Sequence, residues 1–417
     1  MTKIKTVKGT HDILEEDFFF HDKVQKIFEK YCVKYNFRKI STPIIEFSKL
    51  FSRTLGEVSD IVSKEMFTFV DQGGDKITLR PEGTASVSRA LISNSLYEDH
   101  NQKFFYFGPM FRRERPQSGR LRQFTQIGVE YFNQYSNLCD LEVIFLANSI
   151  IQSLGINKKV CLHINSIGNT TSRNKYVVEL TKFLEKFKSE LSEESQIRLD
   201  KNPLRILDSK NIKDKRIIEG APDIKNFLDF TSKENYEELK ENIINSGIDF
   251  VENSNLVRGL DYYNDTVFEF VTNVDKGQNT ILAGGRYDGL VKVIGGKDIC
   301  GVGWAAGIER IVNLIKENEK VKKRIICIFS TSKNNNVEIF KTLKALENID
   351  SHSFHPIFHG NLKKKLNKAN KLDAEACIII GDDEFKDNKL IFKNFNTGRQ
   401  EQVDIKLIFQ FLNKQFI

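Results

Sequence analysis

The most regular pattern of apolar and polar positions in the chain lies at residues 111–132. From residue 124 onward the side chains fall alternately on two faces, which is typical of a β-strand. Pro and Gly residues just before this run predict a loop. One face of the strand carries both Gln126 and Glu130, because residues an even number of positions apart lie on the same side. We therefore predict a hairpin with arginines on its first arm, a basic turn, and an amide and a carboxylate on a shared face.

Apolar residues at helical or strand spacing predict further elements on both sides of this hairpin. Phe20, Val24 and Phe28 recur on one face of a helix that begins near residue 15. Residues 38–46 include Pro43 and predict an edge strand. Further helices are expected at 141–154 and from about residue 85, and further strands at 66–70, 76–79, 104–108 and 160–165.

Beyond residue 168 the character of the chain changes twice. Residues 169–250 are charged, with mixed signs, and mostly helical in pattern, which predicts an inserted helical subdomain. Strand-forming residues return at 251–318, so we expect this segment to complete one domain with residues 1–168. After a charged linker, strands alternate with helices over 324–417, which predicts a small α/β domain.

The composition fits a globular protein of two or three domains. The chain has 417 residues and a net charge of +7, which is compatible with an RNA partner without requiring one. No apolar run approaches the ~18 residues of a membrane span, and no signal peptide opens the chain. The six cysteines form no C-x-x-C pair, and nothing completes a metal site around His352 and His355. We expect a cytoplasmic protein with no membrane partner and no metal held by its own side chains.

The chemistry of the hairpin favours a charged, polar ligand. Guanidinium groups suit polyphosphates because their donors form a planar fork. A carboxylate and an amide on the neighbouring sheet surface suit a small polar molecule. The alternative is a basic hairpin that is merely solvated. The arginines are Arg112, Arg113, Arg115, Arg120 and Arg122.

This hairpin resembles a known motif. The order Phe111-Arg112-x-Glu114, followed by Arg120-x-x-x-Phe124, is similar to motif 2 of the class II aminoacyl-tRNA synthetases. The surrounding sequence, with Gln126 and Glu130, is similar to that of the histidyl-tRNA synthetases in particular.

Four other segments carry the same resemblance, so that it covers nearly the whole chain. Residues 15–46 resemble motif 1 of the class, and residues 301–310 resemble motif 3. Residues 256–270 and 283–289 resemble two signatures of the histidine enzymes. In the second of these, the paired glycines Gly284 and Gly285 would let a ligand approach the backbone closely.

The resemblance implies an α+β fold. It consists of a class II catalytic domain, with an antiparallel sheet flanked by helices, a helical insertion, and a C-terminal α/β anticodon-binding domain. The implied reaction joins L-histidine and ATP to histidyl-adenylate and pyrophosphate, and then transfers histidine to the 3′ end of tRNA(His). Mg²⁺ is expected to accompany ATP, motif 1 implies a homodimer, and the insertion would meet the acceptor arm of the tRNA.

The resemblance also implies the histidine site. Glu130 would accept from one imidazole N–H, and a tyrosine would pair with the other ring nitrogen. Glu82 belongs to the expected site for the α-ammonium group, although it could instead cap the helix that follows it. The expected histidine-binding residues are Glu82, Thr84 and Gln126 at the α-ammonium end, Arg112 and Arg258 at the carboxylate, and Glu130 with Tyr263, or alternatively Tyr262 or Tyr287, at the imidazole.

The ATP site is implied in the same way, with Arg112 and Arg258 as the catalytic pair at the α-phosphate. Arg258 stands in a run of strand-forming residues, and its alternative role is a salt bridge to Asp261 or Glu269. The other implied contacts are Glu114 with the adenine amino group, Phe124 and Arg310 on the two faces of the ring, and Arg120 and Arg310 at the γ-phosphate.

In the C-terminal domain, a very basic helix is predicted at residues 361–372. Its lysines could contact RNA phosphates, although such a run more often forms a solvated face. They are Lys363, Lys364, Lys365, Lys368 and Lys371.

One competing interpretation comes from a different class of protein. Synthetase-like regulatory subunits of ATP phosphoribosyltransferase keep this fold without catalysis, and they usually lack the anticodon domain and lose catalytic residues. The presence of a C-terminal α/β domain here argues against that alternative. So does the retention of Arg112, Glu130, Arg258, Tyr263 and Arg310.

Overall fold

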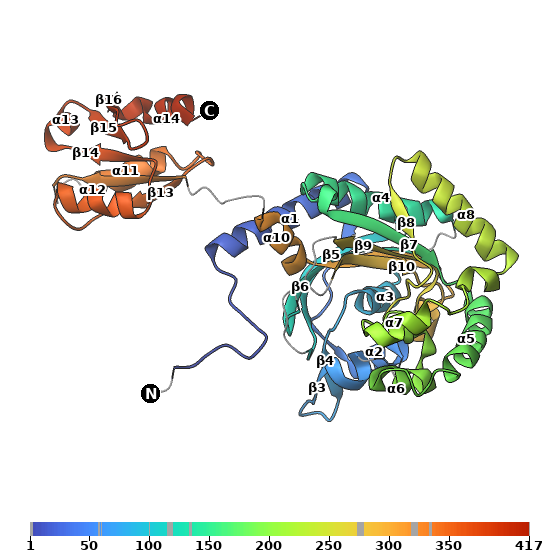
Figure 1. Cartoon of the computed structure of the whole chain (residues 1–417). Helices are drawn as coiled ribbons and strands as arrows, with labels where there is room; N and C mark the ends of the chain where they lie inside the picture. Colours follow the sequence, from blue (N-terminus) through green and yellow to red (C-terminus); the bar gives the residue numbers. More distant parts are fainter. Residues whose placement is uncertain are drawn as a thin grey trace. The chain divides into compact units, whose positions relative to one another are not determined.

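The computed structural model describes residues 3–56, 59, 61–99, 101–114, 120–132, 136–272, 279–317, 324–332 and 336–416. The chain divides into two compact units, Met1–Glu319 and Lys320–Ile417 (Figure 1). Among the described helices, none is both long and apolar enough to span a bilayer.

An eight-stranded sheet forms the centre of the first unit, with the strand order β1-β5-β6-β11-β10-β9-β7-β8. Its six inner strands are antiparallel, and only the two outermost pairs are parallel. The predicted hairpin is β5 with β6, paired so that Tyr106 lies opposite Gly128 and Phe104 opposite Glu130. The strands are β1 (Arg38–Lys39), β5 (Lys103–Phe111), β6 (Gln123–Phe132), β7 (Val160–Ser166), β8 (Phe250–Glu252), β9 (Asn264–Thr272), β10 (Thr280–Arg286) and β11 (Gly301–Gly307).

One face of this sheet is covered by α1 (Glu15–Lys34), α4 (Asn137–Ser153) and α10 (Ile308–Lys316). Trp304 of β11 joins the layers, because its ring lies 5.9 Å from that of Phe28 in α1 and its indole N–H donates to the Val143 carbonyl oxygen of α4 at 2.9 Å. The opposite face, toward α3 (Thr84–Ser93), is therefore the one that carries Gln126 and Glu130 (Figure 1).

The stretch predicted as one edge strand at 38–46 is in fact divided between two sheets. β1 pairs with β5, whereas β2 (Ile45–Phe47) pairs with β4 (Lys76–Leu79) in a three-stranded sheet completed by β3 (Phe67–Val70). Pro43 lies between the two strands, and the pairing of β1 with β5 has already ended at Ile40. The prediction of a single strand was wrong, while the predicted pairing of 66–70 with 76–79 is confirmed. Helix α2 (Ser48–Leu55) follows β2, and the short α9 (Leu290–Ile294) follows β10.

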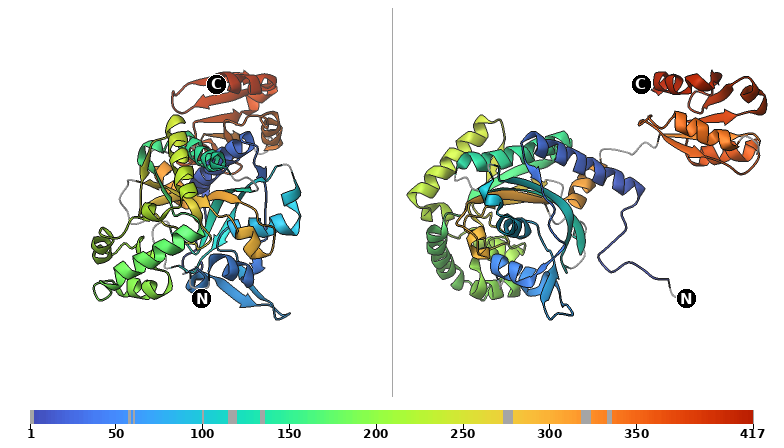
Figure 2. Two further views of the ribbon diagram at one scale, coloured as in Figure 1. Left: turned by 90° about the vertical axis from the view of Figure 1, so that its right-hand side faces the viewer. Right: turned by 180° about the vertical axis from the view of Figure 1, so that it is seen from behind.

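Residues 170–245 are mostly helical, as the charged pattern predicted, and they curve along one side of the first unit (Figure 2). Each of the four α-helices begins after a residue whose side chain accepts a backbone N–H of the first turn, which satisfies an otherwise unpaired donor. The helices and their caps are α5 (Thr170–Glu185) after Asn169, α6 (Glu193–Lys201) after Ser192, α7 (Ile212–Ile218) after Asn211, and α8 (Phe230–Asn245) after Asp229.

The second unit is a five-stranded sheet of order β13-β12-β14-β15-β16 with helices packed against it. β13, β12 and β14 are parallel to one another. β15 pairs antiparallel with β14, and β16 pairs antiparallel with β15. The unit is the small α/β domain that the alternating pattern predicted. Its elements are β12 (Ile325–Ser330), α11 (Asn336–Ala345), β13 (Ser353–Pro356), α12 (Leu362–Lys371), β14 (Ala376–Ile380), α13 (Asp382–Lys386), β15 (Lys389–Asn394), β16 (Gln400–Asp404) and α14 (Ile408–Phe416).

Candidate active site

The Glu130 side chain lies at the centre of the first unit and has no solvent exposure. Its two carboxylate oxygens accept hydrogen bonds from the Thr84 hydroxyl, at 2.7 Å, and from the Tyr287 hydroxyl. Burial raises the pKa of Glu130 to about 8, because a carboxylate is costly to hold away from water. Glu82 adds to the rise, and the two hydrogen bonds oppose it.

The glycines of β11 make the room that this carboxylate needs. A β-carbon at Gly303 would lie 2.2 Å from a Glu130 oxygen, and one at Gly301 would lie 2.3 Å from the Tyr287 ring. The predicted role of Gly284 and Gly285 in ligand approach stays a prediction. Both glycines also allow close strand packing, because a β-carbon at Gly284 would meet the Gly303 carbonyl oxygen at 2.2 Å and one at Gly285 the Thr266 carbonyl oxygen at 2.5 Å.

Glu82 performs the capping role that stood as its alternative. Its carboxylate accepts from the backbone N–H groups of Thr84, at 2.6 Å, and Ala85, at 2.9 Å, in the first turn of α3. Gln126 is tied to the same turn, because its side-chain oxygen accepts from the Gly83 N–H at 3.1 Å. The structure thus brings the residues predicted for the α-ammonium end together around one helix start.

Tyr106 belongs to this pocket and was missed by the sequence analysis. Its hydroxyl donates to the Gln126 oxygen at 3.3 Å. Its ring lies between two glycines, since β-carbons at Gly83 and Gly128 would lie 2.2 and 2.4 Å from it. The pairing of the two hairpin strands could have identified Tyr106. It lies opposite Gly128 and therefore shares a face with Gln126 and Glu130.

The three tyrosines considered for the imidazole form one cluster. The Tyr262 ring lies 4.6 Å from that of Tyr263 and 5.8 Å from that of Tyr287, and the last two are 6.4 Å apart. Tyr287 is the one that binds Glu130, while Tyr263 lies under the Arg258 guanidinium at 5.5 Å. Which tyrosine meets the imidazole stays a prediction.

Arg112 follows β5 directly and continues the hairpin, because its backbone N–H donates to the Arg122 carbonyl oxygen at 2.9 Å. Arg112 donates through Nε to the Pro81 carbonyl oxygen at 2.9 Å, and its guanidinium lies 5.4 Å from the Phe124 ring centre. Glu114 is paired with Arg120 at 3.1 Å and lies 4.0 Å from Arg112. The predicted residues therefore meet one another, whereas Arg115 and the loop to residue 119 fall outside the described residues.

Arg258 lies in an irregular loop and not in a strand, which corrects the prediction from its apolar neighbours. Its guanidinium pairs with Glu269 of β9, one of the two partners expected for a structural role. The second Glu269 oxygen accepts from the Thr280 hydroxyl at 2.7 Å, and the Thr280 carbonyl oxygen accepts from Arg310, also at 2.7 Å. Glu269 thereby connects two arginines that were predicted to hold phosphates.

Arginines outnumber carboxylates at this end of the pocket. Burial lowers the pKa of the Arg310 guanidinium and the nearby Arg120 and Arg112 lower it further, whereas Glu114 and Glu269 raise it. This excess of cations favours a polyanionic ligand, because the positive charges repel one another until a negatively charged ligand binds between them.

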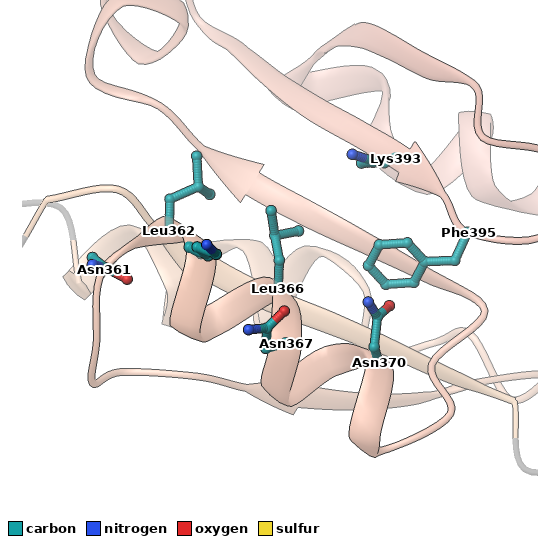
Figure 3. A pocket seen from close by; sticks show the side chains of 8 residues that line it. Asn361, Leu362, Leu366, Asn367, Asn370, Lys393 and Phe395 are labelled. Atoms are coloured by element: carbon teal, nitrogen blue, oxygen red, sulfur yellow. The ribbon is translucent and has the colours of Figure 1, made fainter.

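A hollow of about 660 Å³ lies on the second unit, between α12 and the end of β15 (Figure 3). Lys365 takes no part in it, since its side chain is buried and donates to the Ser330 carbonyl oxygen at 2.7 Å. The idea that this lysine contacts phosphate is therefore wrong, while the other four lysines of α12 are exposed. The hollow is lined by Asn361, Leu362, Lys363, Leu366, Asn367, Asn370, Lys393 and Phe395.

Comparison with known families gives matches in both units. Residues 9–171 and 177–311 match the family model described as histidyl-tRNA synthetase, and residues 333–415 match the one described as anticodon binding domain.

Individual proteins match along the full chain. The histidine–tRNA ligase of Rhodospirillum rubrum is 40% identical over 99% of each chain, and a chloroplastic histidine–tRNA ligase of Gracilaria tenuistipitata is 42% identical over 94% of each. The crystal structure of apo histidyl-tRNA synthetase from S. aureus aligns with a TM-score of 0.80 and 34% identity, and covers 98% of this chain and 99% of its own.

Proposed function

The chain belongs to the histidyl-tRNA synthetase family, and on that premise we propose that the pocket around Glu130 is where it joins L-histidine to ATP. Full-length likeness to histidine–tRNA ligases makes it an aminoacyl-tRNA ligase, and the regulatory alternative is not favoured. The observation that carries the proposal is a buried carboxylate, bonded by Thr84 and Tyr287, in a pocket whose tyrosine cluster also meets the Arg258 guanidinium.

The histidine end of the pocket suits an imidazole. Glu130 accepts from one ring N–H, and Tyr263, Tyr262 or Tyr287 pairs with the other nitrogen. A buried site with paired polar groups rejects analogues that lack those groups far better than an apolar pocket does. The α-ammonium group lies toward Glu82, Thr84 and Gln126, which surround the start of α3.

The family implies use of ATP, and the arginines define the proposed place of its phosphates. Arg112 and Arg258 hold the α-phosphate, while Arg120 and Arg310 hold the γ-phosphate end. Glu114 reads the adenine amino group, with Phe124 and Arg310 against the ring faces. Mg²⁺ is proposed to enter with the β- and γ-phosphates. That fits the chain, because both acids beside the arginines are already engaged, Glu269 by Arg258 and Thr280 and Glu114 by Arg120.

Adenylation then needs no general base. The ionised carboxylate of histidine attacks the α-phosphorus, a new oxygen–phosphorus bond forms, and the bond to the β-phosphate oxygen breaks to release pyrophosphate. Arg112 and Arg258 stabilise the charge that accumulates on the α-phosphate oxygens. In the second step a ribose hydroxyl at the 3′ end of the tRNA attacks the carbonyl carbon and an ester bond forms. The bond from that carbon to the phosphate oxygen breaks, AMP leaves, and the proton of the hydroxyl passes to the departing phosphate.

The remaining assignments concern the domains and the assembly. Residues 1–168 and 251–318 form the catalytic domain, 169–250 the insertion that meets the acceptor arm, and 324–417 the anticodon-binding domain. Within the last, the hollow beside Phe395 offers an aromatic ring, asparagine amides and lysines to an RNA base and its phosphate.

A homodimer through α1 and β2 is proposed because both present large apolar side chains to solvent. Phe18 is 61% and Phe47 49% exposed, and Val33 of α1 and Ile45 of β2 are exposed as well. We also propose a cytoplasmic location, which suits the six free thiols of the chain.

Histidine-dependent exchange of labelled pyrophosphate into ATP is the decisive test. We expect exchange with L-histidine and none with the other amino acids, followed by charging of histidine tRNA. A pure, folded protein that binds histidine but supports no exchange would overturn the proposed role of the pocket.

A further inference from the structure

The loop at residues 257–263 carries Arg258 and two of the pocket tyrosines, yet it has little backbone support. Its residues belong to no helix or strand, and within the described residues its regular backbone structure is a single turn at Asp261 and Tyr262. A phosphate-binding arginine must nevertheless be held closely in place, since a displacement of about 1 Å can cost a rate factor of ~10². Side chains from elsewhere must therefore fix the loop.

Those side chains come from the helical insertion. Arg205, in the short 3₁₀ turn Pro203–Ile206, donates to the Gly259 carbonyl oxygen. Asn202, just before that turn, donates to the Asp261 carboxylate at 2.9 Å.

A third residue of the insertion forms hydrogen bonds with the C-terminal end of the loop. Arg173, near the start of α5, donates to the carbonyl oxygens of Tyr263, at 2.6 Å, and Asp261, at 3.2 Å. The insertion thus bonds three successive points of the loop.

The close packing around the 257–263 loop also holds it in place. A β-carbon at Gly259 would lie 3.7 Å from the Arg205 guanidinium, so this side chain lies directly against the glycine. Asp261 is held from both sides, because a β-carbon at Gly56, at the end of α2, would lie 2.2 Å from its second carboxylate oxygen. The face of the loop toward the insertion is bonded, and the other face presents Arg258 to Glu269.

We propose that Arg205 is a positioning residue for adenylation, which, with Asn202 and Arg173, places the 257–263 loop and hence the Arg258 guanidinium at the α-phosphate. The insertion then contributes to amino-acid activation itself, in addition to any contact with tRNA. This inference rests on the proposed function of Arg258.

A double-mutant cycle tests it, because residues that act through one another have non-additive effects. The full-length variants are Arg205→Met, which keeps an unbranched stem, Arg258→Ala and the double variant. Lys188→Ala is the matched control, since it removes an exposed ion pair with Asp200 within the same insertion. Single-turnover formation of histidyl-adenylate is measured beside thermal melting.

We expect Arg205→Met to slow adenylate formation by about tenfold or more, with melting close to that of the control. In the Arg258→Ala background the same change should cost less than about threefold, because the loop no longer carries the group that needs placing. The KM values for ATP and histidine should change less than the rate.

The outcomes separate the inference from the proposed function. Normal adenylation by Arg258→Ala would overturn the proposed function of that residue. Slow adenylation by Arg258→Ala with a control-like rate for Arg205→Met would overturn the inference alone, as would effects that simply multiply in the double variant. If Arg205→Met does not fold, Asn202→Ala, which removes one bond to Asp261, goes through the same cycle with the same criteria.

Discussion

The Glu130 carboxylate accepts a hydrogen bond from the Thr84 hydroxyl at 2.7 Å, although the two residues stand 46 positions apart in the chain. Thr84 opens α3, the helix whose first turn is capped by Glu82. The residues proposed for the imidazole and for the α-ammonium group of histidine are therefore directly bonded. A change at one end of the histidine site should be felt at the other.

The first prediction concerns Glu130→Gln. The amide can still accept one hydrogen bond, but it loses the charge and can present its NH₂ group to an imidazole N–H. Bonds to charged groups contribute roughly 1.5–3 kcal/mol, so the KM for histidine should rise by about tenfold or more while the KM for ATP changes little. Steady-state pyrophosphate exchange measures both, at a pH of about 8 or above, where Glu130 is ionised.

A matched control is Glu46→Gln, which neutralises another buried carboxylate, one that pairs with Arg89 at 2.6 Å outside the pocket. It should lower the melting temperature without changing the KM for histidine. An unchanged KM in Glu130→Gln would remove Glu130 from the histidine site.

The second prediction is a pH dependence of histidine binding. The pKa of Glu130 is raised to about 8, so the free protein carries mostly the neutral acid below that pH. Only the carboxylate accepts an imidazole N–H with full charge assistance. The KM for histidine should therefore fall as the pH rises toward about 8, and Glu130→Gln should flatten that slope.

The same pKa shift has a definite sign for stability. Glu130 binds its proton more tightly in the folded chain than at its ordinary pKa of 4.5, so folding takes up protons between pH 4.5 and about 8. Its contribution is fully present below pH 4.5 and is lost as the pH rises through about 8. Denaturant melts across this window should show a smaller loss of unfolding free energy in Glu130→Gln, and an equal loss would contradict the shift.

The parts of this site that follow a local period could be predicted from the sequence. Gln126 and Glu130 share a face because a strand repeats every two residues, and that repeat needs no tertiary information. Arg310 falls at a helix start because glycine-spaced strand residues give way to helical spacing at Ile308. These placements depend only on near neighbours in the chain.

Placements that depend on distant partners could not be predicted. Arg258 lies among strand-forming residues, but its segment forms a loop that is hydrogen-bonded by side chains of the insertion. Lys365 belongs to a basic helix, but its position on α12 turns it toward the Ser330 carbonyl oxygen. Tyr106 was overlooked because its role becomes visible only when Gly83 and Gly128 are seen to enclose its ring.

The third prediction is that the chain forms a homodimer, broken by Phe47→Asp. Phe47 of β2 is 49% exposed on the proposed interface, where a buried carboxylate would be unpaired. Val178→Asp, on the exposed face of α5, is the control and should stay dimeric. Sedimentation velocity measures the mass of the wild-type protein and of both variants in solution. A wild-type protein that sediments at micromolar concentration as a 48.1 kDa monomer would count against the assembly.

The fourth prediction is that a chain ending at Glu319 keeps histidine-dependent pyrophosphate exchange but loses efficient charging of tRNA. The first compact unit ends there, and it contains every residue proposed for the two small substrates. The match to an anticodon binding domain lies wholly beyond that point. Unchanged charging by the truncated chain would show that the second unit does not read the tRNA.

The fifth prediction separates the two roles open to Arg258. Its ion pair with Glu269 is present, so a structural role is real and must be tested against a catalytic one. If the pair only stabilises the fold, Arg258→Ala and Glu269→Gln should both melt earlier and leave the folded protein active. If Arg258 binds the α-phosphate, the two variants should differ sharply in adenylate formation.

On the catalytic reading, Arg258→Ala loses a preorganised donor at the reacting phosphate, which costs about 2.7–4 kcal/mol or a rate factor of ~10²–10³. Glu269→Gln keeps that donor, so its rate should fall far less. Arg258→Lys should recover little, because an ammonium group cannot reproduce the planar fork. Transfer from preformed histidyl-adenylate should suffer less than its formation, since no pentacoordinate phosphorus is made from ATP in that step. Single-turnover kinetics beside melting curves decide the matter: normal adenylation with a lowered melting point would make Arg258 structural, because removing a group that stabilises the transition state must slow the reaction.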